Sequence, residues 1–112
     1  MENKKVIFLC GATDRYEEFD RYADALRMMG YRPLLPTRLP WGITREQEIQ
    51  ICMALINGAD AVLALSEWEK DICASFEINY CELIEKPLIL PPKGPDVKPY
   101  WLREALEEVF KA

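Results

Sequence analysis

Apolar runs with the length of buried strands alternate along this chain with segments that have the periodicity of amphipathic helices. Val6–Cys10 is apolar at every position and stops at Gly11, which is typical of a strand buried on both faces of a sheet. The other strand candidates are residues 32–35, 61–65 and 87–90, and the helix candidates are residues 17–29, 44–58, 72–85 and 100–111. This alternation predicts a parallel sheet with helices on both faces, joined by right-handed crossovers.

The expected fold is a doubly wound α/β sandwich of three layers, similar to flavodoxin-like and Rossmann-like proteins, with four or five parallel strands in the order 2-1-3-4. In this order the winding reverses between the first and third strands, and ligands bind where the loops that leave those two strands diverge. The loops in question are residues 11–18 and 66–71. The 112 residues suit a single domain, residues 1–112, because a chain of this length buries one core.

The composition excludes several classes of protein. The formal net charge is -5, whereas proteins that bind nucleic-acid polymers concentrate Lys and Arg into a basic patch. No apolar stretch is long enough to span a membrane and no secretion signal opens the chain, so we expect a cytoplasmic protein without a membrane partner.

Histidine is absent from the chain. Its absence excludes Ser-His-Asp and Cys-His catalysis and argues against a zinc site, and we expect neither a metal nor a cofactor. The four cysteines, Cys10, Cys52, Cys73 and Cys81, form no CxxC pair and are interpreted as reduced core residues. Any acid–base chemistry must then use carboxylates, lysines or tyrosines.

Residues 66–77, with the sequence SEWEKDICASFE, bring several acidic side chains to one of the two loops at the expected ligand site. At about 100° per residue, Glu77 shares an arc of the helix over residues 72–85 with the apolar Ile72, Phe76 and Leu83. A carboxylate on an apolar face must be paired, hydrogen-bonded or turned toward a cleft. We therefore expect either a ligand-facing Glu77 or an ion pair with Arg15, Arg21 or Arg45.

The remaining acids of this stretch also have a structural interpretation. Ser66 and Glu69 fit the spacing of a capping box, and Asp71 fits the N-cap of the helix that follows it. Acidic side chains near a helix N-terminus are favourable without any ligand. Both interpretations stay open at the level of the sequence.

The aromatic residues near the two loops have alternative interpretations as well. Gly11 would let the backbone approach a ligand closely, and Tyr16 and Phe19 could stack on a base. Phe19 also fits the buried stripe of the helix over residues 17–29. Trp68 fits either a pocket wall or a subunit contact.

Four segments of the chain resemble a family of small phage and bacterial proteins that is related to nucleoside 2-deoxyribosyltransferases. They are GATDRYEEFDR at residues 11–21, GYRPLLP at residues 30–36, GADAVLALSEWE at residues 58–69 and DICASFE at residues 71–77. The last segment is similar to the D-x-G-x-x-x-E signature of the transferases themselves, and Lys86-Pro87 matches the turn before the family's last strand. The resemblance covers residues 6–90.

The resemblance implies cleavage or transfer at the N-glycosidic bond of a deoxynucleoside, nucleoside or nucleoside monophosphate. It implies that Glu77 is the nucleophile and that Asp71 helps to bind or protonate the substrate. The substrate-binding residues expected in the two loops and at the start of the following helix are Gly11, Ala12, Thr13, Asp14, Tyr16, Phe19, Trp68, Glu69 and Cys73. Relatives complete their pockets across subunit contacts, so a homo-oligomer is expected, with Trp41, Trp68 and Trp101 as candidate interface aromatics.

Two other functions remain as alternatives. Cys73 stands where the family usually has glycine, and Cys52 stands where relatives often carry an aspartate, so the chain could instead be a non-catalytic binder of a nucleotide-like small molecule. A phosphoacceptor receiver domain shares the architecture but needs an aspartate at the end of the third strand, where this chain has Leu65-Ser66. The receiver interpretation is therefore disfavoured.

Overall fold

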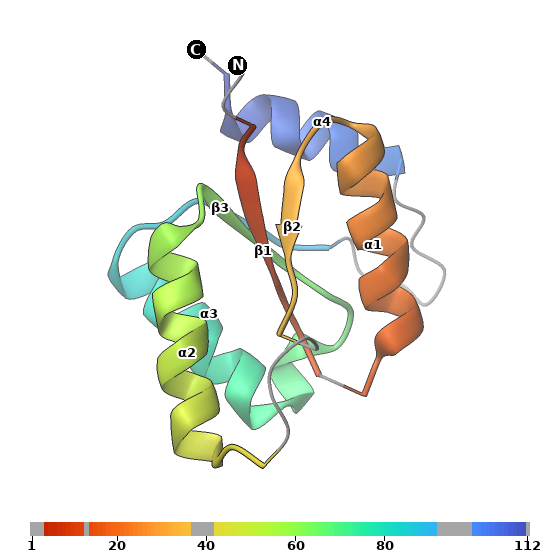
Figure 1. Cartoon of the computed structure of the whole chain (residues 1–112). Helices are drawn as coiled ribbons and strands as arrows, with labels where there is room; N and C mark the ends of the chain where they lie inside the picture. Colours follow the sequence, from red (N-terminus) through yellow and green to blue (C-terminus); the bar gives the residue numbers. More distant parts are fainter. Residues whose placement is uncertain (1–3, 13, 37–41, 92–99, 112) are drawn as a thin grey trace.

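The computed structural model describes residues 4–12, 14–36, 42–91 and 100–111. Its strands are β1 (Val6–Cys10), β2 (Arg32–Leu34), β3 (Ala61–Ala64) and β4 (Leu88–Ile89). They form one parallel sheet in the order β2-β1-β3-β4, which confirms the predicted fold class and strand order (Figure 1).

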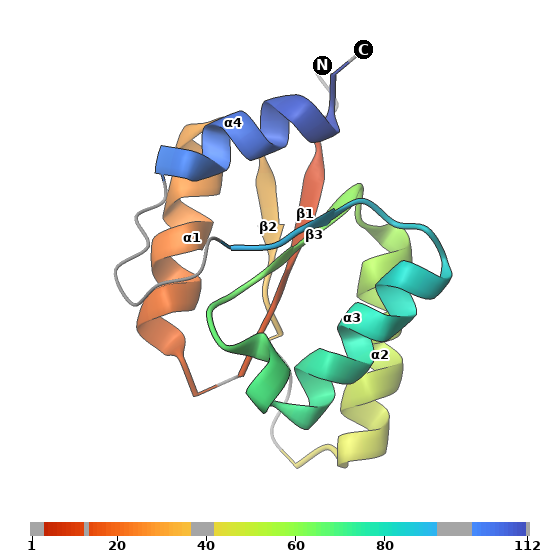
Figure 2. The same ribbon diagram turned by 180° about the vertical axis from the view of Figure 1, so that it is seen from behind.

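Two pairs of helices cover the two faces of the sheet. The helices α1 (Tyr16–Met28) and α4 (Tyr100–Val109) lie on one face, and α2 (Arg45–Gly58) and α3 (Ile72–Leu83) lie on the other (Figure 2). A short 3-10 helix, η2 (Trp68–Lys70), joins β3 to α3. None of the described helices has the length and apolar character that a membrane span requires.

The side chains of β1 and β3 are divided between two separate cores because successive residues of a strand point to opposite faces. Ile7 and Leu9 pack under α1 and α4, whereas Phe8 and Cys10 pack under α2 and α3. These two strands are therefore apolar throughout, as expected for the central strands of a sheet covered on both sides. This alternation directs the Cys10 thiol toward α3.

A capping box fixes the start of α2, and Thr44 and Gln47 have the spacing in the sequence that predicts one. Thr44 Oγ1 accepts a hydrogen bond from the Gln47 main-chain N–H at 3.0 Å, and the Gln47 side chain accepts one from the Thr44 N–H at 2.8 Å. The cap satisfies two main-chain donors that a helix start otherwise leaves without partners.

The buried face of α3 differs from the predicted arc. The buried residues are Ala74, Glu77, Ile78 and Cys81, whereas Ile72, Phe76 and Leu83 are 71%, 47% and 80% exposed. The helix is turned by roughly one residue, about 100°, from the predicted orientation. The reason is close packing, since the main-chain oxygen of Ala74 lies 3.5 Å from Cys10 Sγ and leaves no room for a large side chain. Glu77 belongs to both arcs, so the prediction that it faces inward is confirmed.

Candidate functional site

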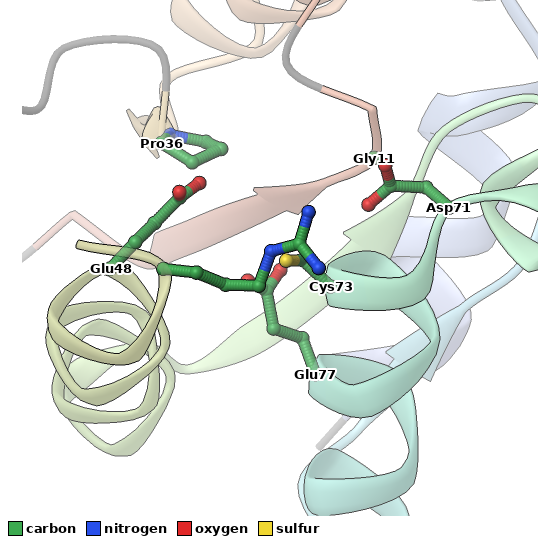
Figure 3. A pocket seen from close by; sticks show the side chains of 7 residues that line it. Gly11, Pro36, Glu48, Asp71, Cys73 and Glu77 are labelled. Carbon is green, nitrogen blue, oxygen red and sulfur yellow. The ribbon is translucent and has the colours of Figure 1, made fainter.

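A polar cavity of about 150 Å³ opens beside the end of β1, on the α2 and α3 side of the sheet. Its lining residues come from the end of β1, the segment after β2 and the first turns of α2 and α3, and they are Gly11, Pro36, Arg45, Glu48, Asp71, Cys73 and Glu77. Figure 3 shows the side chains of α2 and α3 converging on this space from opposite sides. The pocket lies near the switch point of the sheet, where the strand order predicts a ligand.

Gly11 brings the end of β1 against the end of β3. A Cβ atom at this position would stand 3.0 Å from Leu65 Cβ, which is closer than side chains normally approach. The glycine therefore serves tight packing of the two strand ends as well as access to the pocket.

Glu77 lies in the second turn of α3 and is only 3% exposed. The Cys10 thiol donates a hydrogen bond to its Oε1 at 3.2 Å. Mainly through burial, the pKa of this carboxyl rises from 4.5 to about 7. Hydrogen bonding by the Cys10 and Cys52 thiols lowers the pKa, whereas the negative charges of Glu48 and Asp71 raise it further. Near neutral pH, the protonated and the ionised forms of this buried acid are therefore both populated.

No arginine neutralises Glu77 within the described residues. Arg15, one of the three expected partners, instead pairs with Glu18 and Glu67. Arg45 reaches the lining of the same pocket but forms no ion pair with Glu77 in the described part of the chain. The ion-pair interpretation of Glu77 is therefore wrong, and the cleft-facing interpretation describes its position.

Asp71 is both the N-cap of α3 and a lining residue of the pocket, as the two interpretations of the sequence suggest. Its Oδ2 accepts a hydrogen bond from the Ala74 main-chain N–H at 2.8 Å, so it is the N-cap of α3. Its carboxylate also lines the pocket, on the side opposite Glu48 (Figure 3). One oxygen is thus committed to the helix, while the side chain as a whole borders the space in which a ligand would sit.

Three lining residues were absent from the predicted site, namely Pro36, Arg45 and Glu48. Glu48 stands one helical turn before Cys52, whose side chain is fully buried beside the sheet. Residues four apart share a helix face, so this spacing was the available signal that Glu48 points the same way. Pro36 and Arg45 reach the pocket through the tertiary fold and carry no comparable signal.

Thiols form the apolar side of the environment of Glu77. Cys10, Cys52 and Cys81 are fully buried and Cys73 is half-buried in the pocket lining, and all four are free. Burial is the largest cause of a raised pKa for each thiol, and the Glu77 charge adds to it at Cys10, Cys52 and Cys73. The thiols thus stay protonated and unreactive at neutral pH. Across the described ranges, no group of three or more His, Cys, Asp or Glu side chains is arranged to hold a metal ion.

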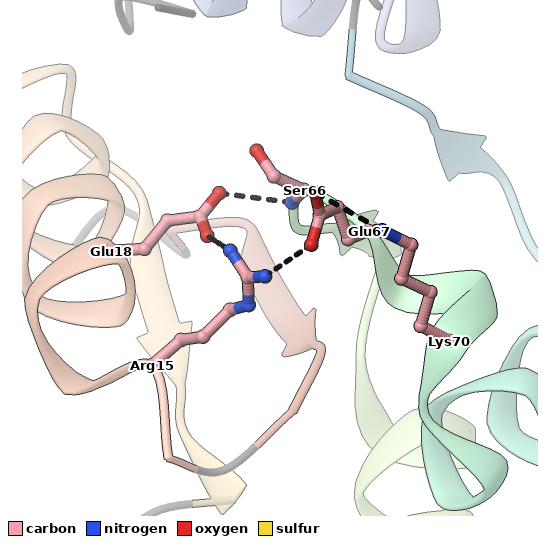
Figure 4. Close-up of polar contacts among 5 residues, drawn as sticks. All are labelled: Arg15, Glu18, Ser66, Glu67 and Lys70. Atoms are coloured by element: carbon pink, nitrogen blue, oxygen red, sulfur yellow. Dashed lines mark hydrogen bonds and ion pairs between the residues drawn. The ribbon is translucent and has the colours of Figure 1, made fainter. Parts of the chain in front are cut away.

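A charged network joins the two loops at the switch point (Figure 4). Arg15 lies 2.6 Å from Glu67 and 3.5 Å from Glu18, and Glu67 also pairs with Lys70 at 3.4 Å. Glu18 Oε2 accepts a hydrogen bond from the Ser66 N–H at 2.9 Å, so α1 and the loop after β3 are tied directly. Glu67 takes a left-handed conformation with φ 57°, and Lys70 and then Arg15 lower the pKa of its carboxyl.

This network replaces the capping box expected at residues 66–69. The Ser66 N–H bonds to Glu18, and Glu67, the residue before η2, makes no side-chain cap. The prediction of a box between Ser66 and Glu69 is therefore wrong. The physical reason is that the Glu18 carboxylate of α1 accepts the hydrogen bond from the Ser66 N–H, which the side chain of Glu69 would accept in a capping box.

Of the eleven residues predicted for the site, four line the pocket: Gly11, Asp71, Cys73 and Glu77. Phe19 is fully buried in the core under α1, so its predicted stacking on a base is wrong and its core interpretation is correct. Trp68 packs, half-buried, against the core on the other face of the sheet. Four more predicted residues lie outside the lining: Asp14, Tyr16 and Glu69 are exposed, and Ala12 is half-buried. Thr13 falls outside the described residues.

The candidate interface aromatics differ in their surroundings. Trp101 packs edge-on against Tyr22, with their ring centroids 6.2 Å apart, so this residue stabilises the α1 and α4 layer. Trp41 lies outside the described residues.

Fold and site together define a doubly wound α/β protein with an acidic pocket at the ends of its parallel strands. Residues 8–90 match the family described as a domain of unknown function, DUF4406. Because this match covers most of the chain, the protein belongs to that family. No curated protein matches the chain.

Proposed function

We propose that the protein cleaves or transfers the N-glycosidic bond of a nucleoside, deoxynucleoside or nucleoside monophosphate, with Glu77 as the nucleophile. The observation that carries the proposal is a carboxylate only 3% exposed, unpaired with any described cation, that lines a pocket at the switch point of the sheet. A buried carboxylate without a counter-ion destabilises the fold, and such groups are concentrated at functional sites. Its presence therefore supports a function for Glu77.

The chemistry proceeds in two steps that use the residues of this pocket. In the first, a Glu77 carboxylate oxygen bonds to the anomeric carbon while the bond from that carbon to the base nitrogen breaks. The electron pair of that bond stays on the base, which takes up a proton from Asp71 or from water. In the second, a water molecule or the nitrogen of another base attacks the same carbon and gives up a proton to Asp71 or to water, while the bond from that carbon to Glu77 breaks and releases Glu77 as a carboxylate.

The resemblance to the nucleoside 2-deoxyribosyltransferases supports the same assignment. The segment DICASFE, similar to the D-x-G-x-x-x-E signature, begins at the N-cap of α3 and ends at the buried carboxylate. Both of its acids line one pocket.

Base release measured by liquid chromatography tests the proposal. The protein is incubated with the common deoxynucleosides and with their 5'-monophosphates, and wild type is compared with Glu77→Gln and with Glu82→Gln, an exposed acid of the same helix. We expect Glu77→Gln to lower base release about a thousandfold or more and Glu82→Gln to leave it unchanged. Base release that survives in Glu77→Gln rejects the nucleophilic role.

A non-catalytic binder is the second candidate, and the observation that favours it is the Cys73 side chain in the pocket lining. A side chain there occupies space that glycine would leave to a substrate. Saturable binding of a nucleoside by calorimetry, without base release by the wild type, would select this function. Self-association stays a prediction, which light scattering after size-exclusion chromatography can measure.

A further inference from the structure

The hydrogen bond between Cys10 and Glu77 links the end of β1 to the proposed nucleophile. We infer that Cys10 is a positioning residue, whose thiol holds the Glu77 carboxylate in place at the pocket and favours its ionised form. This inference rests on the proposed function, in which Glu77 must be ionised and correctly oriented to attack a substrate.

The geometry makes Cys10 a direct and inaccessible partner. Its Sγ lies 3.2 Å from Glu77 Oε1, and the residue is fully buried as the last member of β1. The thiol also lies 3.5 Å from the Ala74 main-chain oxygen. A thiol carries one hydrogen, so it can donate to Glu77 when the carboxyl is ionised and to Ala74 when the carboxyl is protonated. The thiol thus has an acceptor in either state of Glu77.

Charged and titratable groups face Glu77 from each element packed around it. They are Cys10 from β1, Arg45, Glu48 and Cys52 from α2, and Asp71 and Cys73 from α3. Burial and the charges of Glu48 and Asp71 favour the protonated carboxyl, whereas the Cys10 and Cys52 thiols favour the ionised one. Among these groups, Cys10 is the one whose side chain lies at a hydrogen-bond distance of 3.2 Å from the carboxylate in the described structure.

Cys81 provides a matched structural comparison within the same layer. It is also fully buried, but its Sγ donates to the Lys86 main-chain oxygen at 3.4 Å. Truncating either thiol removes one buried sulfur from the core under α2 and α3. Only the truncation at Cys10 removes a donor to Glu77.

The experiment follows the Glu77 side-chain carboxyl by 13C NMR across pH in wild type, Cys10→Ala, Cys10→Ser and Cys81→Ala. We expect Cys10→Ala to raise the titration midpoint by about half a unit or more, because a hydrogen bond to the charged form is lost. Cys10→Ser should lower the midpoint below that of wild type, since a hydroxyl donates more strongly than a thiol. Cys81→Ala should leave the midpoint unchanged.

Each other outcome overturns the inference. A midpoint that does not move in Cys10→Ala, or moves equally in Cys81→Ala, shows that Cys10 only fills space. Should Cys10→Ala fail to fold, Cys10→Ser decides alone, and a midpoint equal to or above that of wild type contradicts the role.

The NMR titration does not depend on turnover, so the two proposals can fail separately. An enzyme that releases no base, but whose Glu77 titration responds to Cys10 as stated, rejects the nucleophile and keeps the positioning contact. An active enzyme whose pH-rate profile and Glu77 titration both ignore Cys10 rejects the positioning role alone.

Discussion

The two faces of the sheet use the same strands for different purposes. On the α1 and α4 side, the core contains large side chains such as Phe19, Tyr22 and Leu26 and, among its fully buried members, no charged group. On the α2 and α3 side, small side chains such as Cys10 and Ala74 surround the buried carboxylate of Glu77. The first layer maximises apolar burial, whereas the second gives up part of it to hold an acid beside a pocket.

This difference assigns stability to one layer and the proposed chemistry to the other. Neighbouring residues of β1 serve both layers, since Leu9 points to the first and Cys10 to the second. Changes in one layer should therefore affect the other only weakly. Substitutions in one layer, followed by measurements of stability and of the Glu77 titration, test that separation.

The largest loss of stability is expected from the α1 and α4 layer. Leu26→Ala removes a fully buried side chain and should lower the free energy of unfolding by about 2–5 kcal/mol, measured by urea denaturation. The pKa of Glu77 should stay near 7 in the folded variant. A Glu77 titration that moves by a full unit or so in this variant would show that the two layers are coupled.

Glu77 should make stability depend on pH in the direction set by its raised pKa. The carboxyl titrates at about 7 in the folded protein and near its ordinary value of 4.5 when unfolded, so the folded state binds more protons between these values. The stabilising contribution of protonated Glu77 is complete below 4.5 and is lost as the pH rises to about 7.

Comparison with Glu77→Gln isolates this contribution. Over that pH interval the unfolding free energy of wild type should fall relative to the variant by on the order of 3 kcal/mol. Denaturation at a series of pH values measures the difference. Parallel curves for the two proteins would mean that Glu77 ionises normally.

Asp71 should show two separable roles. Asp71→Ala removes the N-cap of α3 and should destabilise the protein by about 1 kcal/mol in thermal or urea denaturation. Asp71→Asn keeps a good capping side chain but cannot donate a proton to a leaving base, so it should retain stability while base release falls to the part that takes its proton from water. Equal activity in Asp71→Asn and wild type would limit Asp71 to capping.

The smallest effect is expected at the exposed network between the loops. Arg15→Gln breaks the contacts of a solvent-accessible guanidinium with the half-buried Glu18 and the exposed Glu67, and solvent-accessible pairs contribute about 0–1 kcal/mol. The change in unfolding free energy should shrink further at high salt. A loss well above this range, or one insensitive to salt, would show that the network is part of the core.

The fold was predictable because its signals are local and periodic. The unbroken apolar run at Val6–Cys10 and the capping box at Thr44 each indicate one element, and the alternation of strands and helices predicts a parallel sheet covered on both faces. The inward orientation of Glu77 was predictable for the same reason, since Glu77 belongs both to the predicted arc and to the buried face that the structure shows.

The rest of the site depends on tertiary contacts that periodicity does not contain. The exposed Ile72 and Phe76 follow from the close approach of Ala74 to β1, which a hydrophobic pattern cannot anticipate. Glu48 reaches the pocket from α2, and Arg15 reaches Glu67 across a separation of 52 residues. These pairings arise only when the sheet brings the strand ends together.

The most direct test of the central claim is a search for a sugar covalently bound to Glu77. A deoxynucleoside analogue with fluorine on the sugar slows the second step, and peptide mass spectrometry then locates any adduct. We predict an ester at Glu77 that forms as the base is released and is absent from Glu77→Gln. An adduct at another residue, or rapid base release with Glu77 unmodified, would contradict the account.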